Sequence, residues 1–143
     1  MNLPIPADAL FDLIVDTVCV VDAYGRFLYV SASGEQLFGY SCEEMRGLYM
    51  IELVHPDDRG RTLLAAARIL AGKPVTRFEN RYVRKDGSVV TIQWSACWSA
   101  EHRVRVAVAR AVERDASDPR NAAFAGSASP MTEPAETATD RSG

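Results

Sequence analysis

The chain has 143 residues, the usual size of a single domain, and its 48% of hydrophobic residues is enough to form a core. Its 16 basic and 19 acidic residues give a net charge of −3, so there is no positive excess to attract nucleic acid or an anionic membrane. The three cysteines are odd in number and far apart, which argues against a disulfide framework or a zinc site. Without a signal-peptide pattern or an apolar run near the ~20 residues of a membrane span, we expect a cytoplasmic protein.

An amphipathic helix is predicted near the N-terminus, over residues 7–18, because apolar residues recur there at helical spacing. The apolar stripe consists of Leu10, Phe11, Ile14, Val15 and Val18. We assign residues 1–16 to a helix that flanks the domain. Residues 17–31 then contain two runs of β-branched and aromatic residues around a turn at 22–25, the pattern of a β-hairpin.

Short helices are predicted after the hairpin. One covers residues 32–39 and ends at Gly39. Ser41 stands three residues before Glu44, the spacing of a capping box, and indicates the start of another helix, which Gly47 ends.

The stretch VHPDDR, residues 54–59, brings a histidine and two carboxylates together and raises the question of a metal or acid–base site. A metal site needs further ligands, and the only other histidine of the sequence, His102, falls on a predicted hairpin turn. Pro56 suits the first position of a helix, and carboxylates in a first turn are favoured by the helix dipole. We therefore interpret the stretch as the start of a helix and predict no metal site.

The second half of the sequence predicts one longer helix and three strands. Residues 59–71 carry apolar residues at helical spacing, namely Leu63, Leu64, Ala67, Leu70 and Ala71. Alternating residues predict strands over 75–84, 89–99 and 103–112. Strands at both ends with helices between them favour an α+β fold, with one antiparallel sheet and helices on one face. Residues 115–143, rich in Ala, Ser, Thr, Pro and Gly, are predicted to form a disordered tail.

Several motifs in order resemble those of the PAS domains, which are sensory and dimerisation modules of signalling proteins. They are VVDAYGRFLYVSASGEQLFGYSCEEMRG (20–47), ELVHPDDR (52–59), NRYVRKDGSVVTIQW (80–94) and VAVARAVER (106–114). The resemblance covers residues 17–114 and implies a single five-stranded antiparallel sheet with short helices on one face. Two departures stand out: Ser31 replaces a frequent asparagine, and Ala111-Val112 replaces the Asp-Ile that leads into an output connector.

The resemblance also bears on cofactors. Flavin photoreceptors of the family carry a reactive cysteine just after the glycine that is Gly47 here, and Met50 stands about at its position, which argues against flavin–cysteine photochemistry. Haem-binding members commonly supply an axial histidine from the long helix, and residues 59–72 contain none. The cofactor therefore stays unknown.

A ligand pocket is implied between the inner face of the sheet and the helices. In the register that the resemblance suggests, strand alternation directs Val21, Phe27, Phe78 and Ala96 inward. The pocket residues that we predict are Cys19, Tyr29, Phe38, Met50, Leu64, Asn80, Tyr82, Ile92 and Trp94, with Ala67 as the alternative to Leu64 on the long helix. Asn80 and the Tyr82 hydroxyl would be its polar groups. The same side chains could instead fill the space as an ordinary core, since periodicity does not distinguish a lining from a filling.

The outer face of the sheet is predicted to form an interface with the flanking helix, either within one chain or between two. Its residues are Leu10, Phe11, Ile14, Val18, Val20, Val106 and Val108. A β-branched patch of this kind needs a cover, and the resemblance implies a homodimer.

Three functions remain open. The first is a non-enzymatic sensory module that binds a small molecule in its core or signals through homodimerisation to a downstream signalling protein. The second is an adaptor with a filled core that makes protein contacts alone. The third is a small α+β enzyme, which would need a buried acid, and the candidates Glu52 and Glu79 do not alternate inward.

Overall fold

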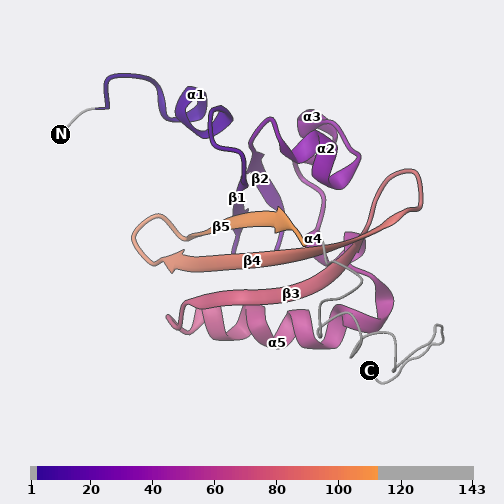
Figure 1. The fold of residues 1–143 in the computed structure, drawn as a ribbon. Helices are drawn as coiled ribbons and strands as arrows, with labels where there is room; N and C mark the ends of the chain where they lie inside the picture. Colours follow the sequence, from indigo (N-terminus) through magenta and orange to yellow (C-terminus); the bar gives the residue numbers. More distant parts are fainter. Residues whose placement is uncertain (1–2, 113–143) are drawn as a thin grey trace.

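The structure, a computed structural model, describes residues 3–112, so the tail predicted at 115–143 lies outside the described residues. Five antiparallel strands form one sheet in the order β2-β1-β5-β4-β3 (Figure 1). The strands are β1 (Thr17–Asp22), β2 (Phe27–Val30), β3 (Val75–Val83), β4 (Val89–Ser99) and β5 (Val104–Ala111). The predicted α+β fold is confirmed. Within the described residues the first and last strands, β1 and β5, pair with each other at the centre of the sheet.

Helices occupy the segment between β2 and β3, as predicted. They are α2 (Gly34–Phe38), α3 (Cys42–Met45), α4 (Met50–Leu53) and α5 (Arg59–Leu70). Gly39 adopts φ 77° and ends α2, a backbone conformation that glycine favours. The capping box is also confirmed: the Glu44 N–H donates to Ser41 Oγ at 3.0 Å, and the Ser41 N–H donates to Glu44 Oε1 at 2.8 Å.

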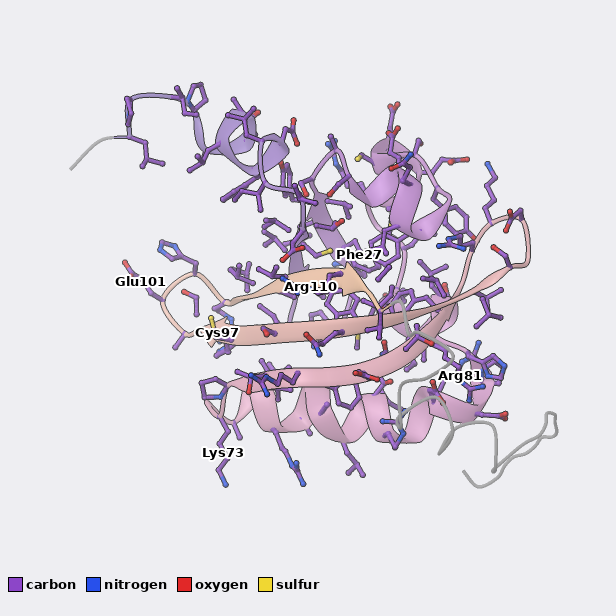
Figure 2. All side chains as sticks on the ribbon, in the orientation of Figure 1. Phe27, Lys73, Arg81, Cys97, Glu101 and Arg110 are labelled. Atoms are coloured by element: carbon purple, nitrogen blue, oxygen red, sulfur yellow. The ribbon has the colours of Figure 1, made fainter. Side chains whose placement is uncertain are left out.

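The VHPDDR stretch begins a helix, as predicted. A 3₁₀ turn over Pro56–Asp58 runs directly into α5, and the Asp57 N–H donates to His55 Nδ1 at 3.1 Å. The buried Asp58 has a second role that the helix interpretation omitted, because it contacts Arg81 of β3 beside the start of α5 (Figure 2). From this contact α5 runs alongside β3 to the turn at Gly72.

The N-terminal helix is shorter than predicted. The helix α1 covers Ala7–Asp12, whereas the prediction extended to residue 18. Residues from Thr17 onward are drawn into β1, where Val18 pairs with Val108 of β5. Pairing in the sheet satisfies the backbone of these β-branched residues and overrides the helical spacing of the sequence.

A β-bulge in the first hairpin changes the inward face of β2. Val20 pairs with Tyr29 and Val21 pairs with Phe27, so Leu28 is the extra residue. Phe27 therefore points to the core, where it is 1% exposed, while Tyr29 lies on the outer face with its ring 5.9 Å from that of Phe11. The prediction that Tyr29 lines the pocket is wrong, because simple alternation does not anticipate the bulge.

The helix α5 buries a different face from the one predicted. Its buried residues are Thr62, Ala65 and Ile69, whereas Leu63 and Leu64 are 54% and 68% exposed. The prediction that Leu64, or alternatively Ala67, closes the pocket is therefore wrong, since Ala67 is exposed too. Both faces of α5 are apolar, and the contacts of Asp58 and Thr62 with β3 select the one that faces the sheet.

Candidate functional site

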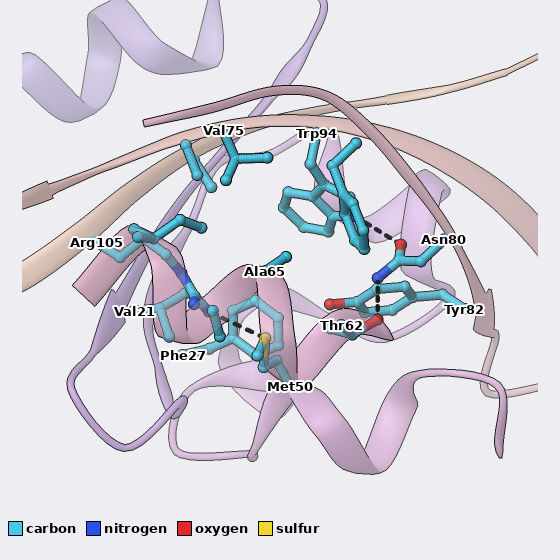
Figure 3. Close-up of a pocket in the computed structure, with 15 residues that line it drawn as sticks. Val21, Phe27, Met50, Thr62, Ala65, Val75, Asn80, Tyr82, Trp94 and Arg105 are labelled. Carbon is cyan, nitrogen blue, oxygen red and sulfur yellow. Dashed lines mark hydrogen bonds between the residues drawn. The ribbon is translucent and has the colours of Figure 1, made fainter. Parts of the chain in front are cut away.

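A small cavity lies between α5 and the inner face of the sheet (Figure 3). About 40 Å³ is open to a water-sized sphere, room for roughly three or four waters if one needs ~10–15 Å³. The walls are mainly aliphatic and aromatic. The lining comprises Val21, Phe27, Met50, Thr62, Ala65, Ala66, Ile69, Val75, Phe78, Asn80, Tyr82, Trp94, Ala96, Arg105 and Ala107.

Small side chains open this space. The inward face of α5 presents Thr62, Ala65 and Ala66, and the sheet opposite presents Ala96 and Ala107. Larger aliphatic residues at these positions would fill the gap between helix and sheet. Beside the cavity the aromatic core is closely packed, because the rings of Tyr82 and Trp94, which line it, and that of Phe38 behind them lie 5.3 to 6.2 Å apart.

One end of the cavity is a hydrogen-bonded network around Asn80. The indole Nε1–H of Trp94 donates to Asn80 Oδ1 at 2.9 Å, and Asn80 Nδ2 donates to Thr62 Oγ1 at 3.1 Å. The Thr62 hydroxyl in turn donates to the carbonyl of Asp58 at 2.8 Å. These bonds join α5, β3 and β4, and they fix the orientation of the Asn80 amide by pairing both its oxygen and its nitrogen with other side chains.

The hydroxyl of Tyr82 points into the cavity (Figure 3). The residue is 2% exposed, and within residues 3–112 its hydroxyl makes no hydrogen bond to another residue. Burial raises the pKa of this phenol because the phenolate would lose its hydration. Tyr82 therefore offers a neutral hydroxyl to whatever enters the cavity.

Arg105 is a cavity residue that the sequence analysis missed. It is 7% exposed, and its Nη2–H donates to the thioether Sδ of Met50 at 3.0 Å. Among the described residues no carboxylate lies within 4.0 Å of its guanidinium. Burial lowers the pKa of Arg105 from its ordinary value, because the charged form loses hydration. The signal was present in the sequence: Arg105 stands between Val104 and Val106, so directing the valines outward directs Arg105 inward.

The comparisons with known proteins agree with this architecture. A family model described as the PAS fold matches residues 27–111. The chain belongs to the PAS fold family. PAS domains are in general sensory modules rather than catalytic ones.

Parts of several longer proteins are similar to this PAS domain. The White collar 2 protein of Neurospora crassa is 36% identical over 69 residues, and the probable diguanylate cyclase DgcE of Escherichia coli is 32% identical over 74 residues. These matches cover 48% and 51% of this chain but only 13% and 7% of the relatives, so they concern a small part of each. A domain of a sensory box sensor histidine kinase/response regulator from Geobacter sulfurreducens is 27% identical, with a TM-score of 0.63 over 71% of this chain and 88% of that one.

Other solved structures support the fold alone. The PAS domain of an HTR-like protein from Haloarcula marismortui has a TM-score of 0.62 at 24% identity, covering 73% of this chain and 93% of that one. Drosophila melanogaster Cycle PAS-B with bound ethylene glycol has a TM-score of 0.61 at 18% identity, covering 67% of this chain and 99% of that one.

The predicted pocket residues of this PAS domain fall into three groups: those that line the cavity, those in the adjoining core, and those outside both. Met50, Asn80, Tyr82 and Trp94 line the cavity. The remaining inward ones, Cys19, Phe38 and Ile92, are buried in the adjoining core without lining the cavity. Tyr29 and Leu64 are outside both, for the reasons given above.

The predicted interface residues lie on the outer face of the sheet and on the N-terminal segment. Val106 and Val108 are 38% and 37% exposed there, Val20 is half-buried, and Val18 is buried. On the N-terminal segment Leu10 and Phe11 are half-buried, whereas Ile14 is 41% exposed. The short α1 thus covers Tyr29 through Phe11 and leaves the valines of β5 open to solvent.

Residues 3–112 contain no group of three or more His, Cys, Asp or Glu residues placed to hold a metal ion. No helix within this range is long and apolar enough to cross a membrane.

Proposed function

We propose that this PAS domain is a non-enzymatic sensor that binds a small molecule in the cavity between α5 and the sheet. The observation that carries the proposal is an apolar cavity into which a buried hydroxyl, that of Tyr82, points without a hydrogen-bond partner among the described residues. Buried polar groups are normally paired, so a ligand that pairs with this hydroxyl would be favoured.

The alternatives are less well supported. An adaptor with a filled core would have large side chains all along the inward face of α5, whereas Thr62, Ala65 and Ala66 leave space beside the one large residue there, Ile69. General acid–base catalysis most often uses a His, Asp or Glu side chain in contact with the substrate, and none of these residue types is among the residues that line the cavity.

Signal transmission would use β5, because this strand has one face in the cavity and the other on the outer surface. Arg105 and Ala107 line the cavity, while the intervening Val106 faces outward beside Cys97 of β4. We propose that the outer face, with Val106 and Val108, pairs with the same face of a second copy. A ligand that prefers one arrangement of α5 and the sheet would then shift the arrangement of the dimer.

The partner that receives the signal is proposed to be a downstream signalling protein in the cytoplasm. The relatives that match this domain include a sensor histidine kinase/response regulator and a probable diguanylate cyclase, in which the match covers only part of a longer protein. The free thiols of Cys19, Cys42 and Cys97 are compatible with a reducing compartment.

The test is a fragment screen by ligand-observed NMR on the full chain and on two matched variants. Ala65→Leu places a larger side chain on the cavity wall, and Ala67→Leu makes the same change on the exposed side of α5. We expect fragments that bind the wild type and Ala67→Leu and that Ala65→Leu no longer binds. Fragments bound equally by all three proteins, or by none of them, would contradict the proposal.

A further inference from the structure

Arg105 is the charged group of the cavity and has no counter-ion in the described part of the chain. Burying a charge is unfavourable unless an opposite charge or several hydrogen bonds compensate it. Within residues 3–112 the one side-chain acceptor at hydrogen-bond distance from Arg105 is the Met50 thioether, which is a weak acceptor. The negative charge of Asp22 acts against the effect of burial on the pKa of Arg105, but Asp22 forms its ion pair with Arg26 and not with Arg105.

The two ends of the cavity differ in what they offer a ligand. At one end, Asn80 is already bonded to Thr62 and Trp94. Arg105 lies at the other end, where its guanidinium points toward Met50 along the side of the cavity (Figure 3). Between the two ends the wall is apolar, as at Ala65. A ligand therefore meets a positive charge at one end and hydrocarbon along its length.

We propose that the ligand of this cavity is a small organic monoanion, a short-chain carboxylate, whose carboxylate pairs with the guanidinium of Arg105. This inference rests on the proposed function, which it refines by naming the chemical class of the ligand. The planar guanidinium matches a carboxylate with two parallel hydrogen bonds. The hydroxyl of Tyr82 supplies a further donor to the same ligand.

Size and charge select this class over others. The open space of about 40 Å³ accommodates only a few heavy atoms. Arg105 is the only Arg, Lys or His among the residues that line the cavity, so a doubly charged phosphate would leave one charge uncompensated in an apolar site. The aliphatic walls favour a hydrocarbon tail over a sugar or a second polar group.

The test compares butyrate with butyramide on the full 143-residue chain, because the amide has a similar size and shape but no charge. The readout is the indole N–H signal of Trp94, a cavity residue, assigned with Trp98→Phe. Arg105→Met removes the charge and keeps an unbranched apolar chain. Arg110→Met is the matched control, since Arg110 lies on the same strand but on the outer face, where it pairs with Asp16 at 3.1 Å.

We expect butyrate to shift the Trp94 signal in the wild type and in Arg110→Met, with at least about tenfold weaker binding in Arg105→Met. Butyramide should bind the wild type at least about tenfold more weakly than butyrate. Arg105→Lys, which keeps the charge without the planar fork, should be intermediate, and it serves the same purpose if Arg105→Met does not fold.

Other results would separate this inference from the function on which it rests. Equal binding of butyrate and butyramide, or full butyrate affinity in Arg105→Met, would overturn the anionic ligand while leaving the cavity as a binding site. The same holds if neither compound shifts Trp94 but neutral fragments bind in the screen described above. Absence of binding by both compounds and by every fragment would overturn the inference and the proposed function together.

Discussion

The carboxylate of Asp58 and the guanidinium of Arg81 form a two-pronged ion pair between the start of α5 and the edge strand β3. Arg81 Nη2 donates to Asp58 Oδ1 at 2.8 Å, and Arg81 Nε donates to Oδ2 at 3.0 Å. The backbone N–H of Arg81 also donates to Oδ2, at 2.7 Å. The side chain of Asp58 is 7% exposed, so the pair fixes the position of α5, and with it one wall of the cavity.

The first prediction concerns the strength of this pair. Asp58→Asn leaves the Arg81 guanidinium without its charged partner, and we expect the free energy of unfolding in urea to fall by about 3 kcal/mol, the lower end of the range for breaking a buried pair. The lower end applies because the Arg81 side chain is 38% exposed and so partly hydrated. Asp57→Asn is the control, because its carboxylate is 51% exposed and 4.0 Å from Arg81. A similar loss in both variants would contradict a specific role for Asp58.

The second prediction is the pH dependence of the same pair. Burial alone would raise the pKa of Asp58, but the hydrogen bonds and the charge of Arg81 outweigh it and hold the pKa below its usual 3.8. A lowered folded-state pKa gives stability that is fully present above the usual pKa and is lost as the pH falls through the folded-state value. The advantage of the wild type over Asp58→Asn should therefore be full at pH 6 to 7, begin to fall below about pH 4, and be lost once the pH lies below the folded-state pKa of Asp58. An advantage that stays constant down to pH 2.5 would contradict this linkage.

The third prediction concerns the polar network at the end of the cavity. Thr62→Val keeps the shape of the side chain but removes the acceptor of the Asn80 Nδ2–H bond. Leaving this buried amide unpaired should lower the free energy of unfolding by about 1–3 kcal/mol and shift the Trp94 indole signal through the shared Asn80. Thr76→Val, on an exposed position of β3, should change neither quantity. An unchanged Trp94 signal in Thr62→Val would show that the network does not couple these residues.

The fourth prediction concerns the outer face of the sheet. Val108→Glu places a charge beside the exposed Val106 on the proposed interface. Light scattering after gel filtration should then show a dimer for the wild type and a monomer for the variant. Leu70→Glu places the same charge on α5, where Leu70 is 44% exposed, and should leave the dimer intact. A wild type that is monomeric at high concentration, or a dimer disrupted only by Leu70→Glu, would contradict the proposed interface.

The fold could be predicted from the sequence because its signals are local and occur in order. The capping box at Ser41 and Glu44, the glycine that ends α2 and the alternating strands each specify an element through short-range contacts. The flanking helix was predicted too long because helical spacing at Val18 competes with pairing to Val108, a residue far along the chain. The β-branched run that starts at Thr17 favours a strand over the same residues, and the pairing partner decides between the two local patterns.

The cavity could be predicted only in part. Met50, Asn80, Tyr82 and Trp94 were identified because strand alternation and the resemblance placed them inward. Tyr29 was misplaced by the single-residue bulge at Leu28, since one extra residue reverses the face of all that follows. Leu64 was misplaced because two faces of α5 are apolar, and tertiary contacts decide between them.

Contacts between residues far apart in the sequence also explain why the roles of Arg105 and Asp58 were not predicted. Arg105 breaks the expectation that charged residues face solvent, although its strand position directed it inward. The carboxylate of Asp58 was explained by helix initiation alone, which is a sufficient local reason. Its bond to Arg81 joins residues 23 positions apart, and only the fold brings them together.

The central claim, that a real cavity separates α5 from the sheet, is tested most directly by methyl NMR under xenon pressure. Xenon enters apolar cavities without needing a specific recognition group. We predict saturable shifts of the methyl signals of Val21, Ala65 and Ile69, which line the cavity, with no change at the exposed Ala67. These shifts should vanish in Ala65→Leu. If the lining methyl signals do not respond, or respond no more than Ala67, the space is filled by the protein itself and the sensor account is wrong.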